Sequence, residues 1–382
     1  MRKPKILILI DWFLPGTKSG GPVRSYANLI EHLAKDFEFY IITRNTDFGS
    51  KIPYSHVEAN TWISINDCTS VYYISANQLN RKHLRKIIKS VDYDVAMING
   101  IYSYFFSILP IFILSHNNRP IIISARGMLN PQAFSVKGFR KKLFLKIAKL
   151  LGLYKGISFH ATNENEANHI KRLIGDHTNI QVAPNLSRVN KFKEAEVKTL
   201  GEPRRFINVA RVSIEKGTLN MLRALKQIKY PLILDIFGPI HDQHYWSKCK
   251  AVIDELPSSI KVNYRGVVDG DTIPNLLRAY DFFVLLSEGE NFGHAILEAF
   301  TAGCPVIISD RTPWKNLEEH EVGWDVPLEQ SNAAISALIM ALEMNQLKYD
   351  TMSNSAIEYA KEIINDPKVL EQNKALFLNA IK

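Results

Sequence analysis

The sequence predicts an α/β protein built from two halves, each a parallel sheet covered by helices. Short apolar segments of strand length alternate with segments of helical periodicity along the whole chain. This pattern restarts after a polar stretch near the middle of the sequence. The length of 382 residues also exceeds what one ordinary hydrophobic core needs, so two domains are expected.

The first half contains six segments with the apolar character of buried strands. They are 6–10, 38–43, 71–74, 95–98, 121–124 and 157–160. Apolar residues recur at helical spacing between them, as over 23–33 and 84–91. The stretch 95–115 has no charged side chain and is long enough to span a bilayer, but Asn99-Gly100 and Pro110 interrupt it. We therefore expect a strand followed by a buried helix over 102–114, not a transmembrane span.

The second half repeats the alternation. Strands are expected at 206–210, 232–237, 261–264, 282–286 and 306–309, and helices near 216–229, 243–255, 293–302, 331–344, 352–364 and 368–381. The expected domains are 1–186 and 204–364, joined by a linker at 187–203. The closing helix at 365–382 is expected to pack back on the N-terminal domain. Two such halves place the carboxyl ends of two sheets at a cleft, where open α/β sheets bind ligands.

The composition is that of a folded protein attracted to anions. The net charge is +9 and the pI is about 9.2, which suits nucleic acid, an anionic membrane surface or phosphorylated small molecules alike. Cys68, Cys249 and Cys304 show no paired spacing, as expected in a reducing compartment. The apolar run at 6–10 is too short for a signal peptide and ends at Asp11, so a cytoplasmic protein is expected.

A glycine-rich turn follows the first predicted strand. Gly20 and Gly21 lack a Cβ, so their backbone amides can approach an anion closely. Pro22 suits the first turn of a helix, and the N-terminus of that helix carries partial positive charge. A diphosphate fits such a place, although an ordinary turn between strand and helix explains the glycines equally well.

Two basic residues follow the first strand of the second half. Arg211 and Lys216 stand five positions apart at a strand end, from which both can reach one anion. The Arg fork matches paired phosphate oxygens and the Lys adds a point charge. The alternative is a pair of solvated surface charges.

The most informative segment runs from Glu288 to Phe300, between two apolar strands. Glu290 is expected in a loop and Glu298 inside the helix that begins near Gly293, in a Glu-x7-Glu arrangement. Backbone amides at the start of this helix would point at whatever Glu290 contacts. Carboxylates accept hydrogen bonds from hydroxyls and amides donate to them, so a sugar ring fits the site.

Taken in order, these segments resemble glycosyltransferase family 4, a large family of retaining transferases with the GT-B fold. The resemblance covers nearly the whole chain and implies two Rossmann-like α/β/α domains facing each other across a cleft. Enzymes of bacterial capsule, O-antigen and exopolysaccharide assembly are the most similar in character. The segments that carry it are Gly20-Gly21, Arg126-Gly127-Met128-Leu129, Pro184-Asn185, Arg211 to Gly217, Phe237-Gly238-Pro239, Tyr264-Arg265-Gly266, Glu290 to Glu298 and Ser309 to Trp314.

The resemblance implies a role for each matching residue. Arg211, Lys216 and Glu290 would be catalytic, the two cations holding the donor diphosphate and Glu290 holding the transferred sugar. Glu298 would bind the ribose hydroxyls of a nucleotide-diphosphate sugar. The remaining donor-binding residues would be Gly20, Gly21, Gly238, Asn291, Phe292 and Gly293. Retention in this family is ascribed to attack on the face that the leaving group departs from, which needs no protein nucleophile.

One position departs from the family pattern. Many relatives carry a His after the strand at 121–124, whereas this sequence has Arg126, which cannot act as a base at neutral pH. Arg126 could still contact sugar or acceptor oxygens. His160 and Glu164 also lie at a strand end. His160 is assigned either to the same contacts or to a buried structural role.

The stretch 137–151 is basic and amphipathic, and two interpretations remain open. It is either a surface helix with its Lys face in water or a helix that docks on an anionic membrane surface near a lipid-linked acceptor.

Cations rather than a metal would neutralise the diphosphate, since no Asp-x-Asp motif appears in a suitable loop. We therefore expect a metal-independent transferase that uses a nucleotide-diphosphate sugar and a glycan or lipid-linked acceptor. The alternatives are a nucleotide-sugar epimerase of the same fold and a non-catalytic sugar or nucleotide binder. Glu290 and Glu298 argue against a nucleic-acid partner, because they would repel its phosphates.

Overall fold

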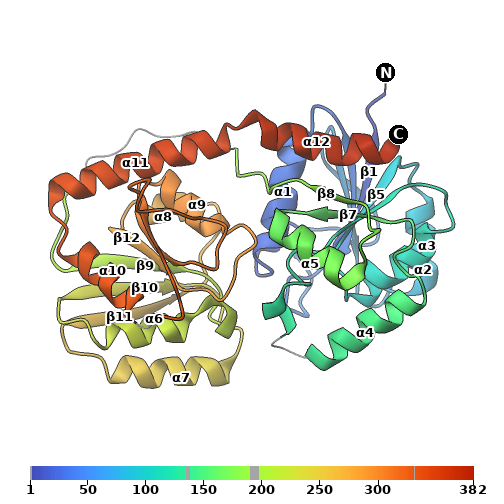
Figure 1. The fold of residues 1–382 in the computed structure, drawn as a ribbon. Helices are drawn as coiled ribbons and strands as arrows, with labels where there is room; N and C mark the ends of the chain where they lie inside the picture. Colours follow the sequence, from blue (N-terminus) through green and yellow to red (C-terminus); the bar gives the residue numbers. More distant parts are fainter. Residues whose placement is uncertain (1, 135–137, 190–197, 331) are drawn as a thin grey trace. The chain divides into compact units, whose positions relative to one another are not determined.

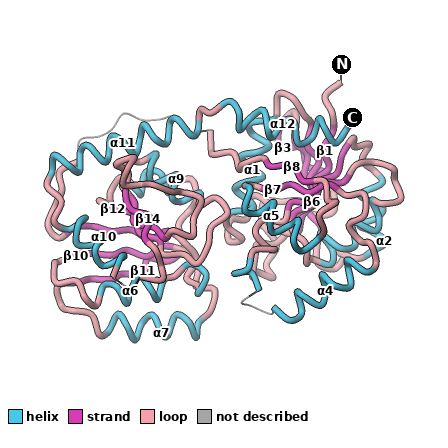
Figure 2. The backbone as a smooth tube through the Cα atoms, viewed as in Figure 1, coloured by secondary structure: helices cyan, strands magenta, loops and turns pink. Residues whose placement is uncertain are grey.

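The computed structural model describes residues 2–134, 138–189, 198–330 and 332–382. The chain divides into two compact units, Met1–Val189 with Asp366–Lys382 (unit 1) and Asn190–Asn365 (unit 2). Each unit has its own sheet and helices (Figure 1). The tube in Figure 2 shows the strands of each unit gathered into one sheet. The predicted α/β class with largely parallel sheets is confirmed.

The described sheet of unit 1 has eight strands in the order β3-β4-β2-β1-β5-β6-β7-β8. All neighbours are parallel except β3 and β4, which pair antiparallel. The strands are β1 Lys5–Leu9, β2 Glu38–Arg44, β3 Trp62–Asn66, β4 Thr69–Ile74, β5 Val95–Asn99, β6 Ile121–Ser124, β7 Ser158–Ala161 and β8 Ile180–Val182. The sequence patterns predicted six of these strands and missed the edge strands β3 and β8.

Side chains alternate across the sheet of unit 1 and fill a core on each face. In β1, Ile6 and Ile8 enter the core that α1 and α12 cover, whereas Leu7 and Leu9 enter the core beneath α2 to α5. The helices are α1 Gly21–Leu33, α2 Arg81–Lys89, the π-helical turn η1 Tyr104–Ile108, α3 Leu109–Leu114, the 3₁₀ turn η2 Pro131–Phe134, α4 Gly138–Leu150, α5 Glu164–Ile174 and α12 Pro367–Ile381.

The segment after β5 differs from the single buried helix predicted over 102–114. Ile108 N donates to Ser103 O at 2.9 Å, the spacing of a π turn, and α3 then begins at Leu109 with Pro110 in its first turn. Tyr104 is 56% exposed and Phe112 is 51% exposed, so two aromatic side chains face outward. No helix in the described part of the chain is long and apolar enough to cross a membrane.

The described sheet of unit 2 is wholly parallel, in the order β11-β10-β9-β12-β13-β14. The sequence patterns missed β14 and the short α8. The predicted linker falls partly on 190–197, which lies outside the described residues, as does residue 331. The elements are β9 Arg204–Val209, η3 Ile214–Lys216, α6 Thr218–Leu225, β10 Leu232–Phe237, α7 Gln243–Asp254, β11 Ile260–Gly266, α8 Ile273–Leu277, β12 Phe282–Leu285, α9 His294–Thr301, β13 Val306–Ser309, β14 Gly323–Val326, α10 Ala333–Leu342 and α11 Gln346–Ile364.

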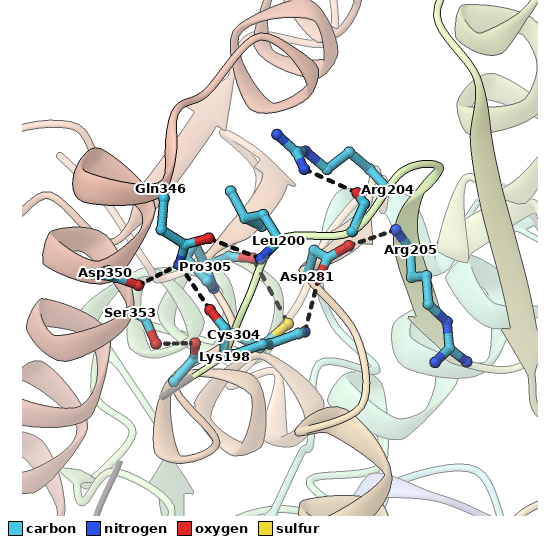
Figure 3. A network of polar contacts seen from close by, with 12 residues as sticks. Lys198, Leu200, Arg204, Arg205, Asp281, Cys304, Pro305, Gln346, Asp350 and Ser353 are labelled. Carbon is cyan, nitrogen blue, oxygen red and sulfur yellow. Dashed lines mark hydrogen bonds and ion pairs between the residues drawn. The ribbon is translucent and has the colours of Figure 1, made fainter. Parts of the chain in front are cut away.

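A polar network fixes the chain where it enters unit 2 (Figure 3). Gln346, at the start of α11, accepts from Leu200 N at 2.8 Å and donates to Lys198 O and to Asp350 at 2.7 Å. Lys198 Nζ forms an ion pair with Asp281 Oδ1 at 2.9 Å. These contacts join the segment before β9 to α11 and to the start of β12.

Replacing Asp281 by alanine is expected to destabilise the protein by about 3–5 kcal/mol, the usual effect of breaking a buried ion pair. Asp281 is 3% exposed and also accepts from Arg205 N at 2.7 Å, so the change leaves two polar groups without an acceptor. Urea unfolding measures the loss. The matched control is Glu358→Ala, which breaks the exposed pair with Lys361 and should cost less than about 1 kcal/mol. Equal losses would contradict the prediction.

The last helix completes unit 1. Phe377 of α12 is fully buried and packs on Phe37, with ring centroids 5.4 Å apart. Asn373 donates to Pro184 O at 2.8 Å, and Lys374 pairs with Asp36 at 3.2 Å. The core of unit 1 therefore contains residues from both ends of the chain.

Candidate functional site

The predicted donor residues of unit 2 lie after the carboxyl ends of its central strands. Two glycines let these loops pack backbone against backbone. A Cβ on Gly217 would lie 1.7 Å from Leu286 O, and one on Gly238 would lie 2.0 Å from Ala210 O. Both glycines have positive φ, 65° and 135°. Glycine is therefore required at both positions, and the loops after β9, β10 and β12 form one layer.

Lys216 and Glu290 meet in this layer although 74 residues separate them. Lys216 Nζ donates to Glu290 Oε1 at 2.6 Å. The side chains are 21% and 9% exposed, so the pair is only partly shielded from solvent. The loops that carry them are joined by a bond of 2.8 Å from Glu288 N to Glu215 O. An ammonium group, which suits phosphate, and a carboxylate, which suits hydroxyls, thus stand side by side and neutralise each other.

Arg211 lies close enough to this layer to influence its charges. Its guanidinium has no hydrogen bond or ion pair with another residue that the structure describes, which leaves its donors available to a ligand. Burial raises the pKa of Glu215, but hydrogen bonds from its own amide and Ser213 and the charge of Arg211 outweigh burial. The pKa of Glu215 therefore lies below its ordinary value.

Residues that the sequence analysis did not single out hold the Glu290 loop. The Arg311 guanidinium pairs with both Glu288 and Glu329, and Glu290 N donates to Arg311 O at 3.1 Å. Ser309 Oγ donates to Ser287 O at 2.5 Å. Arg311 follows β13. In the sequence, a basic residue after this strand, together with the acidic loop at Glu288, could have indicated this ion pair.

The loop then turns into α9 at Gly293, which has a φ of 79°. Trp314 Nε1 donates to Phe292 O at 2.5 Å, and a Cβ on Gly293 would lie 3.2 Å from that nitrogen. Asn291, Phe292, Gly293 and His294 are all partly exposed. Glu298, in the next turn of α9, is 5% exposed. The predicted sugar loop and the helix carrying the predicted ribose acid are therefore one continuous element.

In unit 1, the glycine turn lies open before α1. Gly20 has a φ of 78° and precedes Gly21, the first residue of the helix. Apart from the adjoining residues of the chain, no atom of the described structure lies within 4 Å of a Cβ built on either glycine. Neighbouring packing therefore does not require these glycines, and the space beside them is available to a ligand.

Arg126 is held against α1 in a strained conformation. Its φ is 51°, which an L-residue rarely adopts. The guanidinium stacks on the ring of Tyr26, 4.7 Å from its centroid, and donates to Asn185. Gly127 N donates to Glu166 Oε1 at 2.6 Å, which fixes the turn.

Glu166, not Glu164, is the buried acid of this region. Glu166 is 1% exposed and accepts from Thr162 N at 2.8 Å, while Glu164 is exposed. Asn163 caps α5 by accepting from Glu166 N at 2.9 Å. The spacing Asn163-x-x-Glu166 is that of a capping box, which could have identified the acid from sequence.

His160 has both ring nitrogens committed to the protein. Nδ1 lies 2.9 Å from Ser124 Oγ and Nε2 lies 2.8 Å from Ala183 O. Since a carbonyl can only accept, Nε2 carries the proton and Ser124 donates to Nδ1. His160 is 2% exposed. Of its two suggested roles, this geometry matches the buried structural one and gives no ring nitrogen to a sugar or acceptor.

Acid is expected to destabilise the fold through His160. Burial, aided by the charge of Arg126, lowers its pKa to about 3, although the bond to Ala183 O opposes the shift. In the unfolded chain the pKa is about 6.5. Below pH ~6.5 the imidazole binds a proton in the unfolded chain but not in the folded one. The free energy of unfolding therefore falls toward pH ~3, by up to about 1.4 kcal/mol per pH unit. Urea unfolding across pH 7 to 4 measures the slope. His160→Gln should flatten it, and an unchanged slope would contradict the assignment.

Among the residues that the structure describes, no three His, Cys, Asp or Glu side chains are grouped closely enough to hold a metal ion. Chemically, the layer in unit 2 offers two cations and two acids, and unit 1 offers an open helix N-terminus and a fixed guanidinium.

Known structures resemble the chain over nearly its full length. Sucrose-phosphate synthase from Thermosynechococcus elongatus matches with a TM-score of 0.72 and 19% identity, covering 99% of both chains. Anabaena HepE in complex with UDP and glucose matches with a TM-score of 0.73 and 16% identity, covering 98% of this chain and 100% of that one. The fold is GT-B.

One match to a protein family falls in unit 2. Residues 190–362 match the family model described as "Glycosyl transferases group 1". This range of the chain is therefore similar to the glycosyl transferases group 1 family.

Sequence relatives match part of the chain. An uncharacterized glycosyltransferase of Methanocaldococcus jannaschii is 31% identical over 130 residues, 33% of each protein. UDP-Gal:alpha-D-GlcNAc-diphosphoundecaprenol alpha-1,3-galactosyltransferase of Escherichia coli is 29% identical over 241 residues, 57% of this chain and 59% of the relative. GDP-mannose:cellobiosyl-diphosphopolyprenol alpha-mannosyltransferase of Xanthomonas oryzae is 26% identical over 272 residues, 70% and 69%. The chain thus spans a third and about three fifths of the length of the first two.

Proposed function

We propose that the protein is a retaining glycosyltransferase of family 4. It moves a sugar from a nucleotide-diphosphate sugar to a glycan or lipid-linked acceptor in bacterial surface polysaccharide biosynthesis. The observation that carries the proposal is the Lys216–Glu290 pair, 2.6 Å apart, in a glycosyl transferases group 1 domain. Two relatives whose names give diphosphoundecaprenol-linked and diphosphopolyprenol-linked acceptors support the acceptor class.

When the donor binds, its groups replace the contact between Lys216 and Glu290. Its diphosphate takes Lys216 and Arg211, and hydroxyls of the transferred sugar take the carboxylate of Glu290. Glu298 binds the ribose, while Asn291, Phe292 and Gly293 line the sugar. The ligand thus separates the ion pair: the diphosphate neutralises Lys216, and the sugar hydroxyls donate hydrogen bonds to Glu290, so neither group is left without a polar partner.

The bond to the anomeric carbon breaks as negative charge develops on the departing diphosphate. Arg211 and Lys216 stabilise that charge, which is the main catalytic contribution. The acceptor hydroxyl attacks from the same face and passes its proton to a donor phosphate oxygen. No enzyme nucleophile or metal ion takes part in this scheme. Anomeric configuration of the product, read by NMR, tests retention.

Unit 1 is assigned to the acceptor. The open turn at Gly20 and Gly21 would lie near phosphate and acceptor, and the strained, stacked Arg126 would contact sugar or acceptor oxygens. Backbone strain maintained by surrounding contacts is often found at functional positions. We place the protein in the cytoplasm, at the inner face of the membrane that holds a lipid-linked acceptor.

Thermal shifts with UDP-, GDP-, ADP- and CMP-sugars test the donor assignment. One nucleotide sugar should raise Tm by mass action, and Glu298→Ala should abolish this rise. The Tm of Glu298→Ala without nucleotide sugar should show that the variant is still folded. A rise that persists in EDTA supports metal independence. Absence of any response overturns the proposal, and donor turnover without acceptor would assign the protein as an epimerase instead.

A further inference from the structure

Helix α4 carries an apolar stripe on the side that faces away from the core. Phe139, Leu143, Ile147 and Leu150 recur at helical spacing and are 81%, 47%, 46% and 85% exposed. The opposite side buries Leu145 and Ala148, which the core of unit 1 contains. A surface helix normally has one apolar face. This helix has two, and the second contacts nothing within the described chain that would bury it.

Basic residues flank the exposed stripe. Lys142 and Lys146 lie along one side and Arg140 along the other, and all three are exposed. Lys141 instead lies over the ring of Tyr102, 5.8 Å from its centroid, on the inner side of the helix. Lys137, the first residue of the predicted basic stretch, lies outside the described residues. The outer surface of α4 is therefore apolar in the middle and cationic at its edges.

A cavity of about 1040 Å³ adjoins the C-terminal end of the stripe. It lies between the ends of α4 and α5, neighbouring helices of unit 1 (Figure 1). Basic side chains predominate among its ionisable lining residues, which are Lys149, Lys155, Lys171, Arg172, His177 and Asp176. The apolar residues Leu150 and Leu151, the latter 71% exposed, lie in sequence between the lining residues Lys149 and Gly152.

Helix dipoles explain only part of this charge. Lys149, Lys171 and Arg172 lie in last turns, where the partial negative charge of a helix end favours cations. Lys155 and His177 lie in loops beyond the helices, so this effect does not account for them. None of the four Lys and Arg side chains forms an ion pair with another described residue. The cavity therefore holds cations without their own counter-ions.

We propose that α4 and this cavity form a binding site for anionic phospholipid. The stripe from Phe139 to Leu150 enters the apolar boundary of the bilayer, and the flanking cations face the negative surface. The cavity takes the phosphate headgroup of a lipid. Charge complementarity identifies this occupant, because a protein partner would not need unpaired cations beside an apolar stripe. The proposal deepens the proposed function, on which its purpose rests, since a lipid-linked acceptor is met at a membrane.

The test is sedimentation of the 382-residue chain with vesicles of phosphatidylcholine alone or of phosphatidylcholine mixed with phosphatidylglycerol, whose negative surface attracts basic segments. Binding should require phosphatidylglycerol. Phe139→Ser with Leu150→Ser, and Lys155→Glu with Lys171→Glu, should each weaken it about tenfold or more. The matched controls lie in unit 2: Leu347→Ser, at a side chain 78% exposed, and Lys250→Glu, at an exposed lysine. Neither control should weaken binding more than about twofold.

Competition with inorganic phosphate distinguishes a lipid site from one for free anion. Phosphate at the ionic strength of a chloride control should displace the protein no better than chloride. Equal binding to both vesicle types, wild-type binding by the cavity variants, equal weakening by the controls, or specific displacement by phosphate would each overturn the proposal. The nucleotide-sugar thermal shift reports on unit 2 independently, so failure here is distinct from failure of the transferase assignment.

Discussion

Replacing Lys216 by alanine is expected to lower kcat by about 100-fold or more, equivalent to roughly 3 kcal/mol of transition-state stabilisation. The ammonium group would no longer offset charge on the departing diphosphate. The loss also leaves Glu290, whose side chain is 9% exposed, without the cation 2.6 Å away. Release of nucleoside diphosphate in the presence of donor and acceptor measures the rate. The Tm of each variant shows whether the fold is intact.

A second substitution separates the two effects. In Lys216→Ala with Glu290→Gln, the uncompensated carboxylate is absent, so stability should recover while kcat stays low. The control is Lys226→Ala, which removes an exposed lysine paired with Glu255 on the same unit and should change kcat less than about twofold. If Lys226→Ala slowed the reaction as much as Lys216→Ala, the catalytic assignment would be wrong.

Replacing Gly217 by alanine is expected to destabilise the protein by about 2–5 kcal/mol and to abolish donor binding. The positive φ alone costs roughly 1–2 kcal/mol. The new Cβ would lie 1.7 Å from Leu286 O, a backbone atom that cannot move without shifting the end of β12. Overpacking of this kind adds about 1–3 kcal/mol. Any relief by backbone movement displaces the neighbouring Lys216, which explains the loss of binding.

Gly49→Ala isolates the contribution of the backbone conformation. Gly49 has a φ of 71°, close to that of Gly217, but a Cβ at this position would have no atom within 4 Å. Its replacement should cost only about 1–2 kcal/mol in urea unfolding. Equal losses for the two variants would show that the contact with Leu286 contributes nothing.

The sequence was sufficient to predict the fold class because the central strands are continuous apolar runs. β6, β10 and β13 have the predicted bounds. The missed strands lack that signal for physical reasons. Residues Ser64, Ile65 and Asn66 of β3 are exposed at a sheet edge, and β8 has only three residues. Pairing with a neighbouring strand, not local composition, determines such elements.

The site was less predictable than the fold. Sequence spacing could indicate Lys216 and Glu290 separately as site residues. Their ion pair, however, depends on how two loops 74 residues apart pack together. The same holds for Arg311, whose partners Glu288 and Glu329 lie on different loops. Periodicity identified α4 as basic and amphipathic, but the core covers only one of its two apolar faces. Which face is covered depends on tertiary packing, which a local sequence pattern does not reveal.

The position of α12 determines which of the two units can complete its fold first during translation. Unit 1 lacks Leu376 and Phe377 of its core until α12 is made, whereas unit 2 is complete at residue 365. Phe37 therefore lacks its aromatic partner Phe377 while the intervening segment is translated. Unit 2 can therefore fold first, and nascent unit 1 leaves part of its core uncovered until α12 is made. A truncation at residue 365 would make that transient exposure permanent and favour aggregation.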